Sequence, residues 1–178
     1  MARKSAKPKH RLILLRHAKS AWPDGVADRE RPLAERGRKA AHVIGAYMAR
    51  EKLIPNLALV SPARRAHETW KLVRKTLSGN VDEREAPDVY EVSADRIVDV
   101  IRTVGPDIRT LLIVGHNPSM EDAASLLVAD GDADAMARME DKFPTAGLAV
   151  IDFDTDGWDE LSSGSGYLER FVTPKSVG

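Results

Sequence analysis

Short, nearly continuous apolar runs alternate along the chain with longer amphipathic segments. Such runs are typical of strands buried on both faces of a parallel sheet. Four of them predict strands, over 11–15, 57–60, 110–115 and 148–153, and a weaker fifth is expected over 86–92. The last segment, 158–174, predicts a turn and then an edge strand ending at Pro174, because proline cannot donate a ladder hydrogen bond.

The segments between these runs have the apolar spacing of helices. In 33–50, Ile44 and Met48 lie one turn apart, charged residues fall on the opposite side, and Gly37 is expected on the packed face. Further helices are predicted over 62–77, 94–104, 118–128 and 129–142. Strands that alternate with helices predict an α/β protein, a three-layer α/β/α sandwich with a mostly parallel central sheet.

One domain accounts for the chain. Its 178 residues can bury a substantial core, and no repeat, linker or low-complexity block divides them. We expect the domain to span 11–174 and the basic segment 1–10 to be a disordered tail, because a short Lys-rich stretch buries too little surface to order itself.

Positively charged and titratable residues follow three of the predicted strands. The stretch LILLRHAKSAW places Arg16 and His17 after the first, SPARR places Arg64 and Arg65 after the second, and GHNPSM places His116 after the third. Each motif alone is also compatible with a solvated turn or an exposed helix start. Since the carboxyl ends of parallel strands share one rim, their common placement favours a pocket for a dianion such as phosphate.

The same loops predict two helix starts that suit an anion. Ser61 and Asn117 are candidate N-caps, each followed by a proline at the first helical position. Free N–H groups of both helices would then point toward the rim. His10, His42 and His67 lack this placement and are interpreted as structural.

Composition excludes several classes of protein and of binding partner. The 27 basic and 27 acidic residues cancel, so the broad positive surface of a nucleic-acid binder is not expected. Cysteine is absent, which excludes disulfides and a cysteine nucleophile. No apolar run has the length of a signal peptide core or a membrane span, so a cytoplasmic protein without membrane contact is expected. No feature of the sequence specifies an oligomeric state.

The motifs LLRHAKS, RPLAERGRKAA, SPARRAHET and VGHNPSM, in this order, resemble the histidine phosphatase superfamily, and within it the small SixA-type phosphohistidine phosphatases. The resemblance implies a parallel-sheet sandwich and a covalent phosphohistidine intermediate. It implies that His17 is the nucleophile, that Arg16 and Arg65 clasp the phosphoryl oxygens, and that His116 completes the pocket. Arg64 would replace Arg65 if the loop were shifted by one residue.

These residue types suit phosphoryl transfer. A neutral imidazole can attack phosphorus through one nitrogen while the other is held by a hydrogen bond, and Arg forks match the equatorial oxygens. No metal or cofactor is expected. Glu91 is the nearest candidate for a general acid, although an exposed carboxylate without a role is an equal interpretation. An N–P bond with an imidazole leaving group demands less of such an acid than an ester does.

Other residues have a place in the expected pocket and an equally ordinary structural interpretation. Lys19 and Arg31 would extend the positive rim or be surface charges, and Thr145 would line the pocket or serve a turn. Asn117 is a further candidate beside His116.

The sequence therefore favours an enzyme, a metal-independent phosphatase acting on phosphohistidine of a phosphorelay or phosphotransfer protein. The alternatives are a phosphatase for small phosphomonoesters and a non-catalytic phosphate-binding scaffold protein. A pure binding protein has no need of a nucleophile at a strand end, which favours the enzyme.

Overall fold

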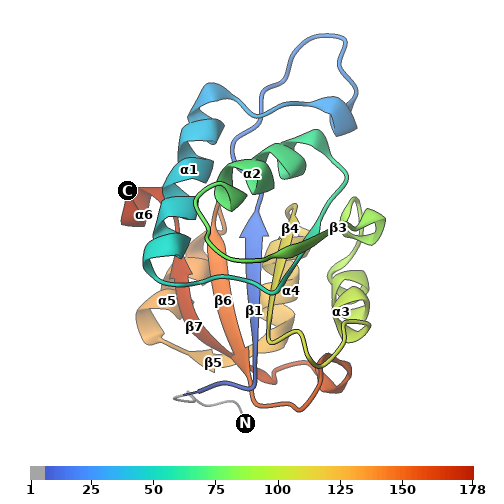
Figure 1. Cartoon of the computed structure of the whole chain (residues 1–178), viewed down its shortest axis with the longest axis vertical. Helices are drawn as coiled ribbons and strands as arrows, with labels where there is room; N and C mark the ends of the chain where they lie inside the picture. Colours follow the sequence, from blue (N-terminus) through green and yellow to red (C-terminus); the bar gives the residue numbers. More distant parts are fainter. Residues whose placement is uncertain (1–6) are drawn as a thin grey trace.

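In a computed structural model that describes residues 7–178, a seven-stranded sheet lies between two layers of helices (Figure 1). The strands are β1 (His10–Arg16), β2 (Leu57–Val60), β3 (Asp82–Glu85), β4 (Thr110–Gly115), β5 (Val128–Gly131), β6 (Leu148–Phe153) and β7 (Gly166–Val172). Their order is β3-β2-β4-β1-β6-β7-β5. Only the β1–β6 and β6–β7 pairs are antiparallel. The predicted α/β sandwich with a mostly parallel sheet is confirmed.

Six α-helices cover the sheet. They are α1 (Glu35–Arg50), α2 (Arg64–Arg74), α3 (Ala94–Arg102), α4 (Ser119–Leu127), α5 (Ala133–Asp141) and the short α6 (Pro174–Val177). Three 3₁₀ turns add to them, η1 (Asp28–Glu30), η2 (Pro87–Val89) and η3 (Trp158–Glu160). Among the described residues, no helix is both long and apolar enough to cross a membrane.

The core has two halves because side chains of a strand alternate between the faces of the sheet. Leu12 and Leu14 of β1 pack with buried residues of α3, α4 and α5 on one face. Ile13 and Leu15 pack with α1 and α2 on the other. Since both faces are covered, β1 is apolar at four successive positions, which explains why the sequence shows a continuous run there.

The four apolar strand predictions are confirmed, and the fifth is wrong. Segment 86–92 forms η2 and a turn, while the neighbouring strand is β3, whose four residues are all charged and exposed. β3 pairs only with β2 at the edge of the sheet, so its side chains need no apolar character.

The chain's later part also departs from prediction. Segment 128–131 is the edge strand β5, so that α5 begins at Ala133 rather than 129. β7 is confirmed as a strand but lies between β6 and β5, and Pro174 opens α6 instead of ending the sheet. β5 has the sequence VADG, with an aspartate and a glycine among its four residues. So few apolar positions do not distinguish a strand from the start of a helix.

His10 belongs to the domain rather than to the tail. It is the first residue of β1, only 1% exposed, and its Nδ1 and Nε2 lie 2.9 and 2.8 Å from the carbonyl oxygens of Thr155 and Pro106. Lys9 pairs with Asp156 on the surface. Residues 1–6 of the expected tail lie outside the described residues. His42 and His67 are exposed on α1 and α2, and Nε2 of His67 lies 3.0 Å from Oε1 of Glu85.

Candidate active site

Arg16 and His17 stand where β1 ends, next to the end of β4. The N–H of His17 donates to the carbonyl oxygen of Gly115 at 2.9 Å, and the N–H of Ala146 donates to the carbonyl oxygens of both Arg16 and His17 at 3.0 Å. Hydrogen bonds on both sides thus fix the backbone at this strand end. A site built on a fixed backbone holds its side chains in fixed positions.

His17 is held as a neutral imidazole. Its ring is 7% exposed, and burial lowers its pKa to about 3 against the opposing effect of its bond to Ala18. Nδ1 lies 2.7 Å from the carbonyl oxygen of Ala18. Because a carbonyl only accepts, Nδ1 carries the proton and Nε2 keeps its lone pair. Nε2 is therefore the atom available for attack.

Arg65 enters the site from the first turn of α2. Its guanidinium is buried, whereas the neighbouring Arg64 is exposed and pairs with Glu68 at 3.1 Å. Thr69, one turn later, donates to the carbonyl oxygen of Arg65 at 2.7 Å and accepts from the N–H of Ala18 at 3.0 Å. This hydroxyl joins the helix that carries Arg65 to the loop that follows His17.

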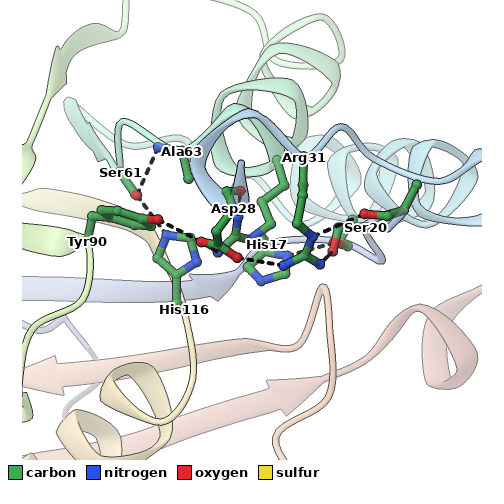
Figure 2. Close-up of polar contacts among 11 residues, drawn as sticks. His17, Ser20, Asp28, Arg31, Ser61, Ala63, Tyr90 and His116 are labelled. Atoms are coloured by element: carbon green, nitrogen blue, oxygen red, sulfur yellow. Dashed lines mark hydrogen bonds and ion pairs between the residues drawn. The ribbon is translucent and has the colours of Figure 1, made fainter. Parts of the chain in front are cut away.

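His116 follows β4 and faces His17, with ring centroids 5.1 Å apart. Burial lowers its pKa to about 4. Its Nε2 lies 2.7 Å from Oγ of Ser61, an atom that also accepts a 3.3 Å hydrogen bond from the N–H of Ala63 (Figure 2). With its oxygen accepting from Ala63, Ser61 can donate its own proton to Nε2, which leaves Nδ1 as the N–H donor of the neutral ring.

Arg16 is oriented by the loop before β6. Its Nη1 donates to the carbonyl oxygen of Phe143 at 3.0 Å, and Nδ2 of Asn117 donates to the same oxygen at 3.0 Å. Desolvation by burial lowers the pKa of the Arg16 guanidinium without discharging it, since an arginine pKa is far above neutrality. Asn117 thus supports the loop that positions Arg16.

Asp28, which the sequence analysis did not single out, connects three side chains around the site. Its Oδ2 accepts from Nη2 of Arg65 at 3.1 Å and from the hydroxyl of Tyr90 at 2.6 Å, and its Oδ1 accepts from Nη1 of Arg31 at 2.9 Å. Its carbonyl oxygen accepts a further 2.8 Å bond from Arg65. Figure 2 shows Asp28 between Tyr90 and Arg31, next to the two histidines. The carboxylate fixes the orientation of the Arg65 guanidinium.

The same contacts decide the charge of Asp28. The Tyr90 hydroxyl, with Arg31 and Arg65, holds the pKa of this carboxyl well below its usual range, even though the residue is 43% exposed. Burial and the bond to Asp28 raise the pKa of Tyr90 to about 12. Asp28 is therefore ionised, and it accepts hydrogen bonds from its partners and has no proton to supply.

Arg31 has a structural place beside the site. It is 6% exposed, donates to Asp28, to the hydroxyl of Ser20 and to the carbonyl oxygen of Ala21, and lies over the ring of the exposed Trp22. Only spatial proximity reveals this network, because Asp28 and Arg31 lie in one loop and Tyr90 lies in another, 62 residues from Asp28. An aspartate three residues before an arginine, as here, is a weak signal in sequence.

The remaining candidates fall outside this cluster. Glu91 is exposed, with a left-handed backbone (φ 55°), and makes no hydrogen bond or ion pair with the described residues. Lys19 is exposed, and Thr145 is half-buried beside Ala146. Both line a separate groove next to the site. The predicted caps are wrong: the N-cap of α2 is Ala63, two residues after Ser61, and that of α4 is Pro118, one residue after Asn117, so Ser61 and Asn117 are free to bond within the site.

The arrangement offers donors to an anion. Nε of Arg16, Nε of Arg65 and Nδ1 of His116 are buried without a partner among the described residues. Buried donors aimed around a nucleophile stabilise negative charge far more strongly than donors in water do. Among the described residues, no group of three or more His, Asp or Glu side chains is placed so that it could hold a metal ion.

The fold and these residues define a class: an α/β protein whose strand ends place two arginines and two neutral histidines in one site with donors for an anion. Comparison with known proteins gives the family. The sequence model of the histidine phosphatase superfamily (branch 1) matches residues 12–94. The chain belongs to the histidine phosphatase superfamily, in its SixA-type branch.

Relatives and solved structures agree over nearly the whole length. The uncharacterized protein Rv1276c of Mycobacterium tuberculosis is 34% identical over 163 residues, which cover 90% of this chain and all of that protein. The SixA structure from Agrobacterium tumefaciens is 29% identical, with a TM-score of 0.78 over 93% of this chain and 99% of the other. A protein histidine phosphatase SixA solved with tungstate shares the fold, with a TM-score of 0.75, 19% identity and coverage of 94% and 99%. These findings support phosphatase activity for this chain.

Proposed function

We propose that this protein hydrolyses phosphohistidine on a phosphorelay or phosphotransfer protein, through a phosphohistidine intermediate on His17. One observation carries the proposal: His17 is neutral, its Nδ1 is held by Ala18, and its Nε2 is free beside Arg16, Arg65 and His116. A neutral imidazole whose tautomer is fixed is ready for in-line attack on phosphorus.

The first step transfers the phosphoryl group. Nε2 of His17 forms a bond to phosphorus while the bond from phosphorus to the substrate imidazole nitrogen breaks, and the leaving imidazole keeps the electron pair and takes up a proton from the solvent. The guanidinium groups of Arg16 and Arg65, with the Nδ1–H of His116, donate to the phosphoryl oxygens as their charge redistributes. In the second step, water attacks phosphorus, His17 leaves, and inorganic phosphate is released.

The environment of Asp28 supports phosphohistidine over an ester as the substrate. The carboxylate that lies closest to the clasping arginine is ionised and accepts three side-chain donors, so it holds no proton for a leaving group. Glu91 is exposed and makes no hydrogen bond or ion pair with the described residues. A leaving imidazole is easily protonated, whereas an alkoxide is not, so a site that lacks a general acid favours the N–P bond.

The test is single-turnover phosphate release by wild type and by His17→Ala. The substrates are a phosphohistidine-bearing protein, a phosphoserine peptide and a sugar phosphate. We expect the wild type alone to act, to prefer the phosphohistidine protein, and to form an acid-labile, alkali-stable phosphoenzyme. Preference for the sugar phosphate would replace the proposal by a small-molecule phosphatase. No turnover of any substrate would favour a phosphate-binding scaffold, and full activity of His17→Ala would overturn the role of the nucleophile.

A further inference from the structure

An open groove of about 690 Å³ lies beside the catalytic site, bounded by α1, α5, the loop before β6 and α6. Its volume is in the range of ligand-binding clefts. Figure 1 shows α1 and α6 side by side at the left of the sheet, and the segments that bound the groove lie far apart in sequence. None of its lining residues is one of the four that form the phosphate-binding site.

The groove is strongly basic. Five of its lining residues are cationic, namely Lys19, Arg36, Arg138, Lys142 and Lys175, and only Asp141 is acidic. The chain as a whole has no net charge, so this concentration is local. Arg138 is paired with Asp134 at 2.8 Å, but the other four cations are exposed and form no ion pair with the described residues. Their charge is available to a partner.

Two walls of the groove continue directly into the catalytic site. Lys19 follows His17 by two residues, and its carbonyl oxygen accepts a 2.9 Å bond from the N–H of Ala34. Gly37 allows this approach, because a Cβ at that position would lie 2.0 Å from the same oxygen. The position of Lys19 is therefore set by the packing of α1 against the catalytic loop.

The opposite wall is the loop that orients Arg16. Thr145 lines the groove and precedes Ala146, whose N–H bonds to the backbone of Arg16 and His17. Pro144 lines the groove as well and follows Phe143, the carbonyl partner of Arg16. The groove therefore shares its walls with the segments that hold Arg16 and His17.

The shape and charge together indicate an extended acidic occupant. A single phosphoryl group is already served by Arg16, Arg65 and His116, whereas the groove is open and carries its cations on several segments, from the loop after β1 to α6. Exposed charges of one sign steer a partner of the opposite sign and set its register more than its ultimate affinity.

We propose that this groove docks an acidic segment of the phosphoprotein whose phosphohistidine enters the catalytic site. This inference rests on the proposed function and adds the kind of sequence that the substrate carries. Asp and Glu side chains flanking the phosphohistidine would meet Lys142 and Lys175 on the groove walls. Recognition would then depend on ionic strength, since exposed pairs are screened by salt.

The experiment compares two phosphohistidine peptides, one with Asp and Glu flanking the phosphohistidine and one with Ala and Gln at those positions. Free phosphohistidine serves as the substrate that cannot reach the groove. We expect wild type to favour the acidic peptide by about tenfold in kcat/KM, mainly through KM, and to lose this preference as salt is raised. Lys142→Glu/Lys175→Glu should remove the preference and leave turnover of free phosphohistidine unchanged.

A matched variant, Lys71→Glu/Lys75→Glu, makes the same change of charge at two exposed positions outside the groove, one in α2 and one at its C-cap. It should keep the wild-type preference. The proposal is overturned if wild type treats both peptides alike, if the groove variant keeps the preference, or if both double variants lose it equally.

Binding of the unphosphorylated peptides to wild type, followed by fluorescence anisotropy, separates the two proposals. Tighter binding of the acidic peptide that the groove variant loses would support the groove even if neither phosphopeptide is hydrolysed, in which case the proposed function fails alone. If both phosphopeptides are hydrolysed and both peptides bind equally well, the proposed function is supported and the docking role of the groove is refuted.

Discussion

Asp28 holds Arg65 by two different atoms: its carbonyl oxygen accepts from Nη1 at 2.8 Å, and its Oδ2 accepts from Nη2 at 3.1 Å. Both terminal nitrogens of the guanidinium are thereby fixed by one residue. The carboxylate also accepts from Tyr90 and Arg31, so its own position is set by the loops on either side. Arg65 is oriented by this arrangement before any phosphate arrives.

Asp28→Asn should therefore lower activity without unfolding the protein. The amide keeps the backbone bond but loses the ion pair, and we expect kcat/KM to fall by about tenfold. Asp24→Asn, an exposed change in the same loop, is the control and should match wild type. Wild-type kinetics of Asp28→Asn would show that Arg65 needs no carboxylate to be positioned.

Thr69→Val tests the link between α2 and the catalytic loop. Valine has the same shape but neither accepts from the N–H of Ala18 nor donates to the carbonyl oxygen of Arg65, both buried. The free energy of unfolding should fall by ~1–3 kcal/mol, measured by denaturant titration. Thr103→Val removes an exposed hydroxyl bond within α3 and should change stability by less than about 0.5 kcal/mol. Equal effects of the two variants would contradict the assigned role of Thr69.

The two histidines of the site should make stability depend on pH. Burial lowers the pKa of His17 to about 3 and that of His116 to about 4, while the unfolded chain titrates near its ordinary value of 6.5. Between these values the unfolded state binds more protons than the folded state, so the free energy of unfolding falls as pH is lowered from about 6.5. At pH 5 the loss is about 1–2 kcal/mol for each histidine.

Denaturant unfolding at several pH values checks this effect. His17→Gln/His116→Gln should show a shallower loss of stability between pH 7 and 5 than wild type does. His42→Gln/His67→Gln, in which both replaced rings are exposed, is the control and should keep the wild-type slope. If the free energy of unfolding depends on pH equally in all three proteins, burial does not keep His17 and His116 neutral in the folded state.

Gly37→Ala should destabilise the protein although alanine is the better helix former. By helix propensity alone the change would stabilise by about 1 kcal/mol. The added Cβ would instead lie 2.0 Å from the carbonyl oxygen of Lys19, an atom of the backbone that cannot yield without moving the catalytic loop. A fall in the thermal midpoint, together with reduced activity, is expected. Lys39→Ala on the exposed side of α1 is the control, and an unchanged midpoint for Gly37→Ala would refute the close contact.

The sequence predicts those parts of the fold in which local pattern and burial agree. β1, β2, β4 and β6 are buried on both faces, so their apolar runs are unambiguous. β3 has no apolar residue, because an edge strand is held by backbone bonds to one neighbour. Its pairing with β2 is a tertiary contact that the local sequence pattern does not predict.

The candidate site also has a part that the sequence predicts and a part that it does not predict. His17, Arg65 and His116 follow buried strands, and the topology brings them together as the sequence predicts. Asp28 and Tyr90 are 62 residues apart and meet only through the folded loops. Their identities were visible in sequence, but nothing in the spacing specified the contact, and neither was among the predicted site residues.

The charges of β3 have a further consequence for how copies of this protein behave beside one another. Asp82, Glu83, Arg84 and Glu85 occupy every position of the strand that closes one side of the sheet, and all four are exposed. A flat apolar border would invite another chain to extend the sheet, whereas a border carrying charges at each residue makes such addition costly. Crowded copies should therefore remain separate along this border, even at the high concentrations used for crystallisation or spectroscopy.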